Sequence, residues 1–296
     1  MPKKQFARLN SEIELLLRPG LTGERQADIF VTPLLHSPML QLFSEVRKNR
    51  ELIWALALKE LRVRYKRSAL GFLWALLNPL LMMVILTVVF SNIMRLPVKG
   101  YAVFLLSALL PWTFFSQSLS YSVESIVGNG ALLQKVRVKK SVFTVAAVLS
   151  NILNFLFSLV PMVLILVVLR FPLHWTWVFL PVPLLALFCF TLGCGFFFAA
   201  VNVFYRDVSH MVQIVLSGWF YFSPVMYSLE FLPQQYRGFF RLNPLLYLLN
   251  EFRMIIYYGQ LPTLRSVVLC LGIGGFFLYL GYAIFKRAEP TFVYYV

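Results

Sequence analysis

The sequence predicts an all-α integral membrane protein. We expect six transmembrane helices, an amphipathic interface helix before them and two short re-entrant helices before the last span. Of the residues, 59% are hydrophobic and only 13% are charged, a balance far from that of a soluble domain. Uncharged runs also recur, each as long as the roughly 20 residues that a helix needs to cross the hydrocarbon core. They cover 68–94, 100–123, 141–169, 171–205, 208–229 and 266–285.

Basic residues are distributed unevenly between the two sides of the predicted bundle. If the chain starts in the cytoplasm, the inner segments hold 20 of the 27 Lys and Arg residues, which is the positive-inside pattern. The formal net charge of +15 is therefore explained by topology and by attraction to anionic lipid headgroups. We expect both termini in the cytoplasm, membrane lipids as partners and no nucleic acid. The inner segments are 1–67, 124–140, 206–207 and 286–296.

The predicted chain begins with a cytoplasmic extension, residues 1–45, and continues with the interface helix, residues 46–67. Between Arg47 and Arg67 there are eight Lys or Arg residues, and the first uncharged run follows directly. A helix in the headgroup layer needs one apolar face and basic flanks that reach water. A plain positive stop signal before the first span is the alternative.

A helical wheel gives this segment two apolar stripes. The wider one should face lipid, and the thinner one, opposite, suggests a contact with protein. The wider stripe holds Trp54, Leu58, Leu61 and Tyr65, and the thinner one holds Leu52, Leu56 and Val63.

The six-span domain should cover residues 68–286, with a basic cytoplasmic segment between its second and third spans. There, Gly128 and Gly130 allow a sharp turn, and apolar residues recur at helical spacing. We therefore expect a short docking helix at about 131–140, with a plain loop as the alternative. Its apolar face would consist of Leu132, Leu133 and Val136.

Two moderately apolar pieces, 231–240 and 244–258, precede the last span. Each is too short to cross a bilayer and too apolar for an ordinary external loop, and Asn243-Pro244 separates them. Short helices of this kind persist at membrane depth where protein covers them or where they line a cavity. We expect re-entrant helices here, then the sixth span and a cytoplasmic tail at 287–296.

Several kinds of chemistry are missing from the sequence. It has no G-x-x-x-x-G-K-[ST] phosphate loop and no Cys/His spacing typical of a metal site. No predicted span carries Asp, Glu, Lys or Arg in its middle, where ion-coupled transporters place such groups. We therefore expect no cofactor in this chain, no enzymatic activity, and an energy source on another polypeptide.

Aromatic residues, at 17%, are plentiful in the second and fifth spans. Their rings can stack on the apolar faces of sugars. The alternative is an interfacial belt or contact with lipid. The candidates to line a channel are Trp112, Phe115, Tyr121, Trp219, Tyr221 and Tyr227.

From about residue 44 onward, the chain resembles the permease subunits of type-2 ABC exporters for polysaccharides, which move O-antigen, capsule and teichoic acid. Four segments carry the resemblance in the family's order. They are LALKELRVRYKRSALGFLWALLNPLL, NGALLQKVRVKK, NVFYRDVSHMVQIVLSGWFYFSPVMY and NPLLYLLNEFRMIIYYGQLP.

The resemblance implies a half-transporter in the bacterial cytoplasmic (inner) membrane. Two copies of this chain would line one channel as a homodimer. Two copies of a separate ABC ATPase, holding ATP and Mg, would bind beneath it. The segment at 131–140 would be the coupling helix, and 231–258 the external gate. The residues implied in contact with the ATPase are Leu132, Leu133, Lys135, Arg137, Lys139, Arg206 and Asp207.

The family's cargo is a lipid-linked polysaccharide whose phosphate enters from the inner leaflet. The interface helix would lie at that entrance, and its cations suit phosphate electrostatically. Ordinary topogenic charge is the alternative. The implied phosphate contacts are Lys59, Arg62, Arg64, Lys66 and Arg67.

Two other functions stay open. A type-2 ABC permease for drugs or small lipids would have a similar architecture. An integral-membrane enzyme acting on lipid-linked sugars would need acidic groups near the headgroups. The candidates for that role are Asp207, Glu230 and Glu251, which are scattered along the chain.

Overall fold

The computed structural model describes residues 38–65, 73–89, 100–135 and 138–295. The chain divides into two compact units, Met1–Gln41 and Leu42–Val296, and the contacts below lie within the second. Throughout the described residues the regular structure is helical and no strand occurs. The predicted all-α class is thereby confirmed.

Among the described residues, four helical segments are long and apolar enough to cross a bilayer. The first two are α6 (Tyr101–Glu124) and α8 (Ser141–Val168). The third joins the 3-10 turn η3 (Trp175–Phe179) to α9 (Pro181–Phe204), and the fourth is α13 (Leu264–Ala288), followed by the 3-10 turn η5 (Glu289–Tyr294). They coincide with four of the six predicted spans.

Shorter helices stand where the other two spans are expected. They are α5 (Leu73–Thr87) and α10 (Val208–Phe222), with 15 residues each. At 1.5 Å per residue, the 15 residues of α10 reach about 22 Å, less than the roughly 30 Å of a hydrocarbon core. The chain on both sides of residues 73–89, which contain α5, lies outside the described ranges. The number of six spans therefore stays a prediction.

The helix α10 ends earlier than its hydropathy suggests. The uncharged run continues to residue 229, yet Ser223 is extended, with φ −94° and ψ 135°. Pro224 is the cause, because proline disfavours the helical conformation of the residue before it. The chain leaves the helix there and turns toward the shorter helices that follow.

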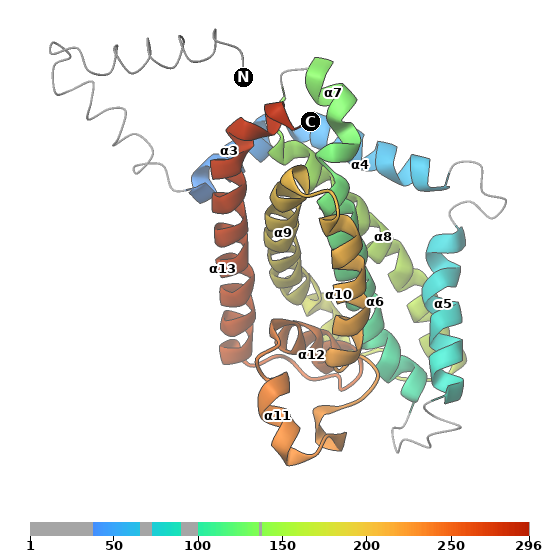
Figure 1. Ribbon diagram of the computed structural model, residues 1–296. Helices are drawn as coiled ribbons and strands as arrows, with labels where there is room; N and C mark the ends of the chain where they lie inside the picture. The colour runs from blue at the N-terminus through green and yellow to red at the C-terminus, as the bar shows by residue number, and fades with distance from the viewer. Residues whose placement is uncertain (1–37, 66–72, 90–99, 136–137, 296) are drawn as a thin grey trace, which may run out of the picture. The chain divides into compact units, whose positions relative to one another are not determined.

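The remaining helices lie at the two ends of these long ones (Figure 1). One end carries α3 (Pro38–Lys48), α4 (Arg50–Tyr65), the 3-10 turn η2 (Val127–Asn129), α7 (Gly130–Lys135) and η5. The opposite end carries the 3-10 turn η4 (Leu229–Phe231), α11 (Gln234–Phe240) and α12 (Pro244–Ile256). The predicted re-entrant pieces are thus helical, and their place relative to a bilayer stays a prediction.

The helix α7 is shorter than the docking helix expected at about 131–140. It ends at Lys135, residues 136 and 137 lie outside the described ranges, and Val138 and Lys139 are not helical. Lys140 then precedes α8 with helical backbone angles. Among the described residues, the expected helix is therefore present at 131–135 and absent at Val138 and Lys139.

Glycine allows α9 and α13 to pack closely along each other. A Cβ atom added to Gly281 would collide with the backbone of Gly193, and one added to Gly193 would collide with the backbone of Phe277. Gly274 likewise faces the carbonyl of Ala186. Small residues at such crossings let the backbones of membrane helices approach.

Asn243 joins the end of α10 to the start of α12. Its Oδ1 accepts hydrogen bonds from the Leu245 backbone N–H (3.1 Å) and from Nε1 of Trp219 (3.0 Å). Its amide nitrogen donates to Oγ of Ser223 at 3.0 Å. A single capping side chain therefore fixes α12, whose first turn begins with Pro244.

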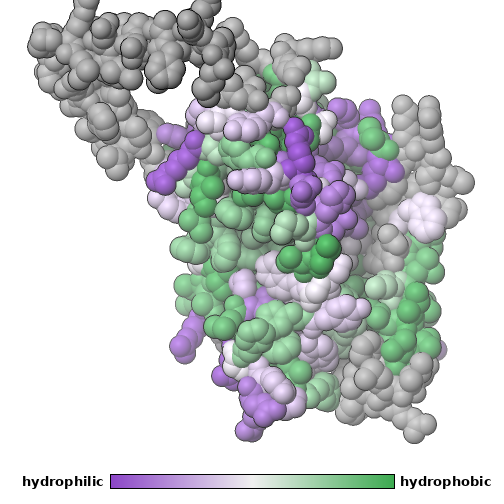
Figure 2. Space-filling view, in the orientation of Figure 1, coloured by the Kyte–Doolittle hydropathy of each residue, from purple (hydrophilic) through white to green (hydrophobic). Residues whose placement is uncertain are grey.

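Hydrophobic side chains cover α13 and α5 on the face shown in Figure 2. Large apolar residues of both helices are solvent-exposed in the isolated subunit. Because no water is present in a bilayer core, such surfaces suit lipid or a partner subunit. Examples are Val268, Leu269 and Phe276 on α13, and Leu81, Val84 and Ile85 on α5.

Candidate functional site

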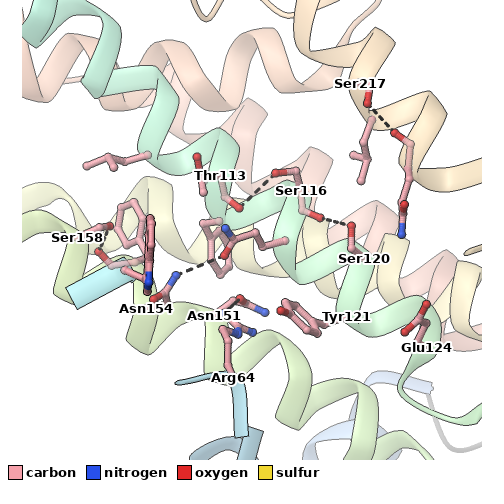
Figure 3. Close-up of a pocket in the computed structure, with 17 residues that line it drawn as sticks. Arg64, Thr113, Ser116, Ser120, Tyr121, Glu124, Asn151, Asn154, Ser158 and Ser217 are labelled. Atoms are coloured by element: carbon pink, nitrogen blue, oxygen red, sulfur yellow. Dashed lines mark hydrogen bonds between the residues drawn. The ribbon is translucent and has the colours of Figure 1, made fainter. Parts of the chain in front are cut away.

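A polar stripe runs along α6, which is otherwise apolar. Its residues recur every three or four positions and therefore lie on one face. The neighbouring helices α8 and α10 add further polar side chains, and together they surround a cavity of about 720 Å³ (Figure 3). The polar residues that line it are Thr113, Ser116, Gln117, Ser120, Tyr121 and Glu124 from α6, Asn151, Asn154 and Ser158 from α8, and Gln213 and Ser217 from α10. We call this cavity the polar groove.

Many of these groups satisfy one another across the groove or along their own helix. Nδ2 of Asn154 donates to Oε1 of Gln117 at 3.3 Å, which links α8 to α6. The Ser120 hydroxyl donates to the Ser116 carbonyl at 2.9 Å, and the Ser217 hydroxyl to the Gln213 carbonyl at 2.9 Å. A hydroxyl bonded in this way keeps acceptor lone pairs for a ligand or water.

One cation reaches the polar groove from α4. Nη1 of Arg64 donates to Oδ1 of Asn151 at 3.0 Å, and the guanidinium carbon lies 4.0 Å from the centre of the Tyr121 ring. Figure 3 shows the three side chains next to one another. Nε and Nη2 of Arg64 are buried and have no hydrogen-bond partner among the described residues. The groove therefore contains a held guanidinium with spare donors.

Glu60 holds this part of α4 against α8. Its Oε2 accepts a hydrogen bond from the Ser150 hydroxyl at 3.1 Å. Burial raises the pKa of Glu60, although Ser150 and the charges of Arg64 and Lys59 act in the opposite direction. The polar contact lies one turn before Arg64 and fixes which face of α4 meets the bundle.

The other candidate phosphate contacts do not share this position. Lys59 and Arg62 lie on the exposed face of α4, beside Trp54, Leu58 and Val63. Lys66 and Arg67 lie outside the described residues. The structure thus separates Arg64, in the polar groove, from Lys59 and Arg62, on an outer surface that combines apolar and basic side chains.

The helical wheel assigned the faces of α4 only in part. Leu56 and Leu61 are buried, whereas Trp54 is 48% exposed and Val63 is 60% exposed. Ile53 and Ala57 are buried as well, and α4 packs against α8. Each of the two predicted stripes contributes to the buried face. The helical wheel groups residues by hydropathy alone, whereas packing against α8 decides which of them are buried.

A second cavity of about 450 Å³ continues the polar groove and adds aromatic walls. The two share Thr113, Ser116, Gln117 and Ser217. The rings of Trp112 and Phe220 lie 5.5 Å apart at its wall, with Tyr221 beside them. Of the aromatic candidates, Tyr121, Trp112 and Tyr221 therefore line this continuous space.

The other aromatic candidates make contacts inside the subunit. Phe115 is fully buried, and its ring packs against Trp219 at 5.4 Å and Phe190 at 5.5 Å. Nε1 of Trp219 donates to Asn243, as described above. The Tyr227 hydroxyl donates to the Tyr221 carbonyl at 2.7 Å. Their observed contacts position α10 and the turn after it.

The candidate residues for contact with an ATPase lie at the α4 end. Leu132 and Leu133 are half-buried on α7, and Lys139 is exposed. Nη2 of Arg206 donates to the Tyr295 carbonyl at 2.8 Å, and Asp207 is exposed. The side chain of Lys135 and all of Arg137 lie outside what the structure describes.

A polar cluster that sequence reasoning missed joins three helices at this end. Nζ of Lys286 contacts Oε1 of Glu45 and Oε2 of Glu289, each at 2.7 Å. Oε2 of Glu45 also accepts from the hydroxyls of Ser141 (2.7 Å) and Tyr282 (3.1 Å). Burial alone would raise the pKa of Glu45, but Lys286 and the two hydroxyls outweigh it and lower the pKa.

The start of α8 belongs to the same cluster. The Lys140 backbone N–H donates to Oε1 of Glu289 at 3.2 Å, and its Nζ donates to the Glu289 carbonyl at 2.9 Å.

In the part of the chain that the structure describes, no group of three His, Cys, Asp or Glu side chains could hold a metal ion.

Comparison with known proteins identifies the family. Residues 51–257 match the model of the ABC-2 type transporter family. The O-antigen export system permease protein RfbA of Myxococcus xanthus is 33% identical over 86% of this chain and 98% of its own length. RfbA of Klebsiella pneumoniae is 30% identical over 82% and 93%, and the polysialic acid transport protein KpsM of Escherichia coli is 27% identical over 80% and 93%.

The match covers α4, the polar groove and both short helices at the opposite end. The cavities described above therefore belong to the shared region. This chain is a member of the ABC-2 type transporter family.

Proposed function

We propose that this chain is the transmembrane subunit of an ATP-driven exporter that moves a lipid-linked polysaccharide outward across the cytoplasmic membrane. The observation that carries the proposal is the polar groove and its aromatic continuation. Hydroxyl and amide groups can exchange hydrogen bonds with sugar hydroxyls, and aromatic faces can stack on sugar rings. The names of the relatives support the same cargo class.

Arg64 is the proposed contact for the phosphate of the lipid carrier. It is placed where α4 meets the groove, and two of its nitrogens have no partner among the described residues. A guanidinium with free donors suits a phosphate group, because charge-assisted hydrogen bonds are the stronger ones. The end of the unit that carries α4 would then face the cytoplasm.

The groove is open, and we propose that a second copy of the chain closes it into a channel. Energy would come from two copies of a separate ABC ATPase that binds ATP and Mg. The observed α7 and the segment Val138–Lys140 would contact this ATPase. A separate ATPase is consistent with the sequence, because the predicted spans carry no charged residue at their centres, where ion-coupled transporters place such groups.

The test is reconstitution. The chain and its candidate ATPase are purified together, placed in proteoliposomes and supplied with a lipid-linked glycan and ATP. We expect a complex with two copies of each subunit and glycan movement that depends on ATP hydrolysis. Absence of ATPase binding, or ATP turnover without glycan movement, would refute the proposal. Transport of small amphiphiles alone would assign the chain to a different cargo class.

A further inference from the structure

A separate cavity of about 530 Å³ lies at the end of the unit opposite α4. The turn after α10, the 3-10 turn η4, the residue after α11, α12 and the loop that follows α12 form its walls. Its volume lies within the roughly 300–1,000 Å³ of typical small-molecule sites. It shares no residue with the polar groove.

Polar side chains from four segments converge on this cavity. Five of these side chains have no hydrogen-bond or ion-pair partner within the described residues. They are Glu230, Arg241, Asn250, Tyr258 and Gln260. A few convergent polar groups set in an apolar wall are typical of ligand sites. The apolar wall here consists of Pro224, Leu229, Leu246, Leu249 and Met254.

Arg253 is buried at the rear of the cavity, and its guanidinium bonds to the backbone through one nitrogen, while its Nε has no hydrogen-bond partner among the described residues. Its Nη2 donates to the carbonyls of Pro224 (2.9 Å) and Val225 (3.0 Å), and its guanidinium carbon lies 3.9 Å from the centre of the Phe104 ring. These contacts tie α12 to the turn after α10 and to α6. The Arg253 guanidinium is therefore held by two backbone carbonyls and the face of the Phe104 ring.

A glycine turn places the loop after α12 at the mouth of the cavity. Gly259 has φ +62°, and a Cβ atom there would collide with the His174 ring. The Gln260 backbone N–H then donates to the Met254 carbonyl at 2.9 Å. The turn thereby brings Tyr258 and Gln260 to the same cavity.

The accessible groups define the class of ligand. Arg241 and Glu230 each bring one charge to the space, of opposite sign, and Arg253 lines it with a guanidinium that is bonded to backbone carbonyls. The polar lining is completed by the amides of Asn250 and Gln260, the phenols of Tyr258 and Tyr247 and the hydroxyl of Ser228, and Tyr258 is 45% exposed. A neutral sugar matches this set, because its hydroxyls both donate and accept while its ring offers an apolar face.

We propose that this cavity is a saccharide-binding site that holds one or two units of a neutral glycan as the chain leaves the transporter. Asn250, Gln260, Glu230 and Arg241 bond to the hydroxyls, and Tyr258 stacks on a ring. The site is distinct from the polar groove. The inference rests on glycan export as the proposed function.

Binding can be measured without transport. The full chain, with its ATPase, is placed in lipid nanodiscs, and saturation-transfer NMR measures the affinity for chitotriose, maltotriose and trigalacturonate. We expect binding of at least one of the two neutral probes and weaker binding of the acidic one. Asn250→Ala and Tyr258→Ala should each weaken neutral binding by about tenfold, as expected for one lost contact.

Matched controls lie on α11, outside the cavity. Gln235→Ala removes an exposed amide and Tyr236→Ala an exposed aromatic ring, and both should bind like the wild type. Thermal unfolding of each variant shows whether it is folded. Asn250 is itself exposed, so its replacement keeps the test valid if Tyr258→Ala unfolds.

Three results would overturn the inference: binding of neither neutral probe, preference for the acidic probe, or equal losses in the cavity variants and the controls. Glycan export by the wild-type complex is measured in parallel. Export that persists without saccharide binding here would refute this site and leave the proposed function intact. Absence of export would instead refute the proposed function.

Discussion

At the scale of single residues, Arg64 differs from the other cations of α4 by its surroundings. It contacts Asn151 and Tyr121 in the polar groove, whereas Lys59 and Arg62 face outward. Five basic residues at 59–67 are equivalent in the sequence. The fold distinguishes Arg64 from Lys59 and Arg62, because helix α4 buries one face against α8.

Replacing Arg64 should therefore impair transport more than replacing its neighbours. We expect Arg64→Gln to lower the rate of glycan export by about tenfold or more, because the substitution removes at least one charge-assisted hydrogen bond. Arg64→Lys should retain part of the activity because it keeps the charge. Export is measured in proteoliposomes at matched protein content.

Lys59→Gln and Arg62→Gln are the controls, since each removes one positive charge from the same helix. We expect both to stay within about twofold of the wild-type rate, as surface charges contribute little. Equal losses of export in all three variants would mean that these residues act as topology signals and not as phosphate contacts.

Glu45 should make stability depend on pH. Its pKa in the folded protein lies below the ordinary value of 4.5, so its charged form stabilises the fold above that value. The contribution is lost as the pH falls below about 4.5 toward the folded-state pKa. Glu45→Gln should cost about 1–3 kcal/mol of unfolding free energy at about pH 7. The difference from the wild type should shrink in acid.

Thermal unfolding in detergent, followed by tryptophan fluorescence between about pH 3 and pH 7, measures this difference. Glu51→Gln is the matched control, because Glu51 is exposed on α4. A gap between wild type and Glu45→Gln that stays constant across this range would show that the carboxylate charge is not the cause.

At the scale of helices, the contact between α9 and α13 depends on glycine. We expect Gly193→Ala to destabilise the protein by about 1–3 kcal/mol, because the added methyl group meets the backbone of α13 and forces the helices apart. Gly272→Ala places the same group on α13 where nothing lies within 4 Å. It should be neutral or slightly stabilising.

Denaturation midpoints of the two variants in the same detergent give the comparison. Similar midpoints for both would mean that the helices separate without cost. The prediction concerns packing alone, so it holds whatever the cargo of the transporter is.

Hydropathy was sufficient to predict the long helices, but not where each element ends. The runs at 100–123 and 141–169 correspond closely to α6 and α8, because a long apolar run has no other stable form in a bilayer. Local backbone rules decided the differences, as when Pro224 ended α10. Hydropathy values carry no information about such a stop.

The sequence was sufficient to predict the kind of candidate site, but not which residues form it. The polar stripe of α6 is visible in the sequence at a spacing of three or four residues, as in Thr113, Gln117 and Ser120. Glu45 and Lys286 could not be paired in advance, since 241 positions separate them. Aromatic type alone did not distinguish Tyr121, in the groove, from Phe115, in the core.

At the scale of the whole molecule, the polar cluster of Glu45, Lys286 and Glu289 connects the start of α8 to the end of α13. Lys140, the last residue of the segment that we propose to contact the ATPase, belongs to this cluster. A movement there would be passed through Glu289 to α13, which packs along α9. This is a contiguous path of contacts, and its coupling is open to measurement.

Glu289→Ala should therefore uncouple the transporter without dissociating it. The substitution removes the acceptor for the Lys140 backbone N–H and one of the two carboxylates on Lys286. We expect the ATPase to bind with unchanged affinity and the glycan exported per ATP hydrolysed to fall severalfold. Arg287→Gln changes an exposed charge on the same turn and should leave that ratio unchanged. If Glu289→Ala keeps the wild-type ratio, motion reaches the bundle by another route. If it abolishes ATPase binding, the cluster supports the docking surface itself and not the transmission of movement.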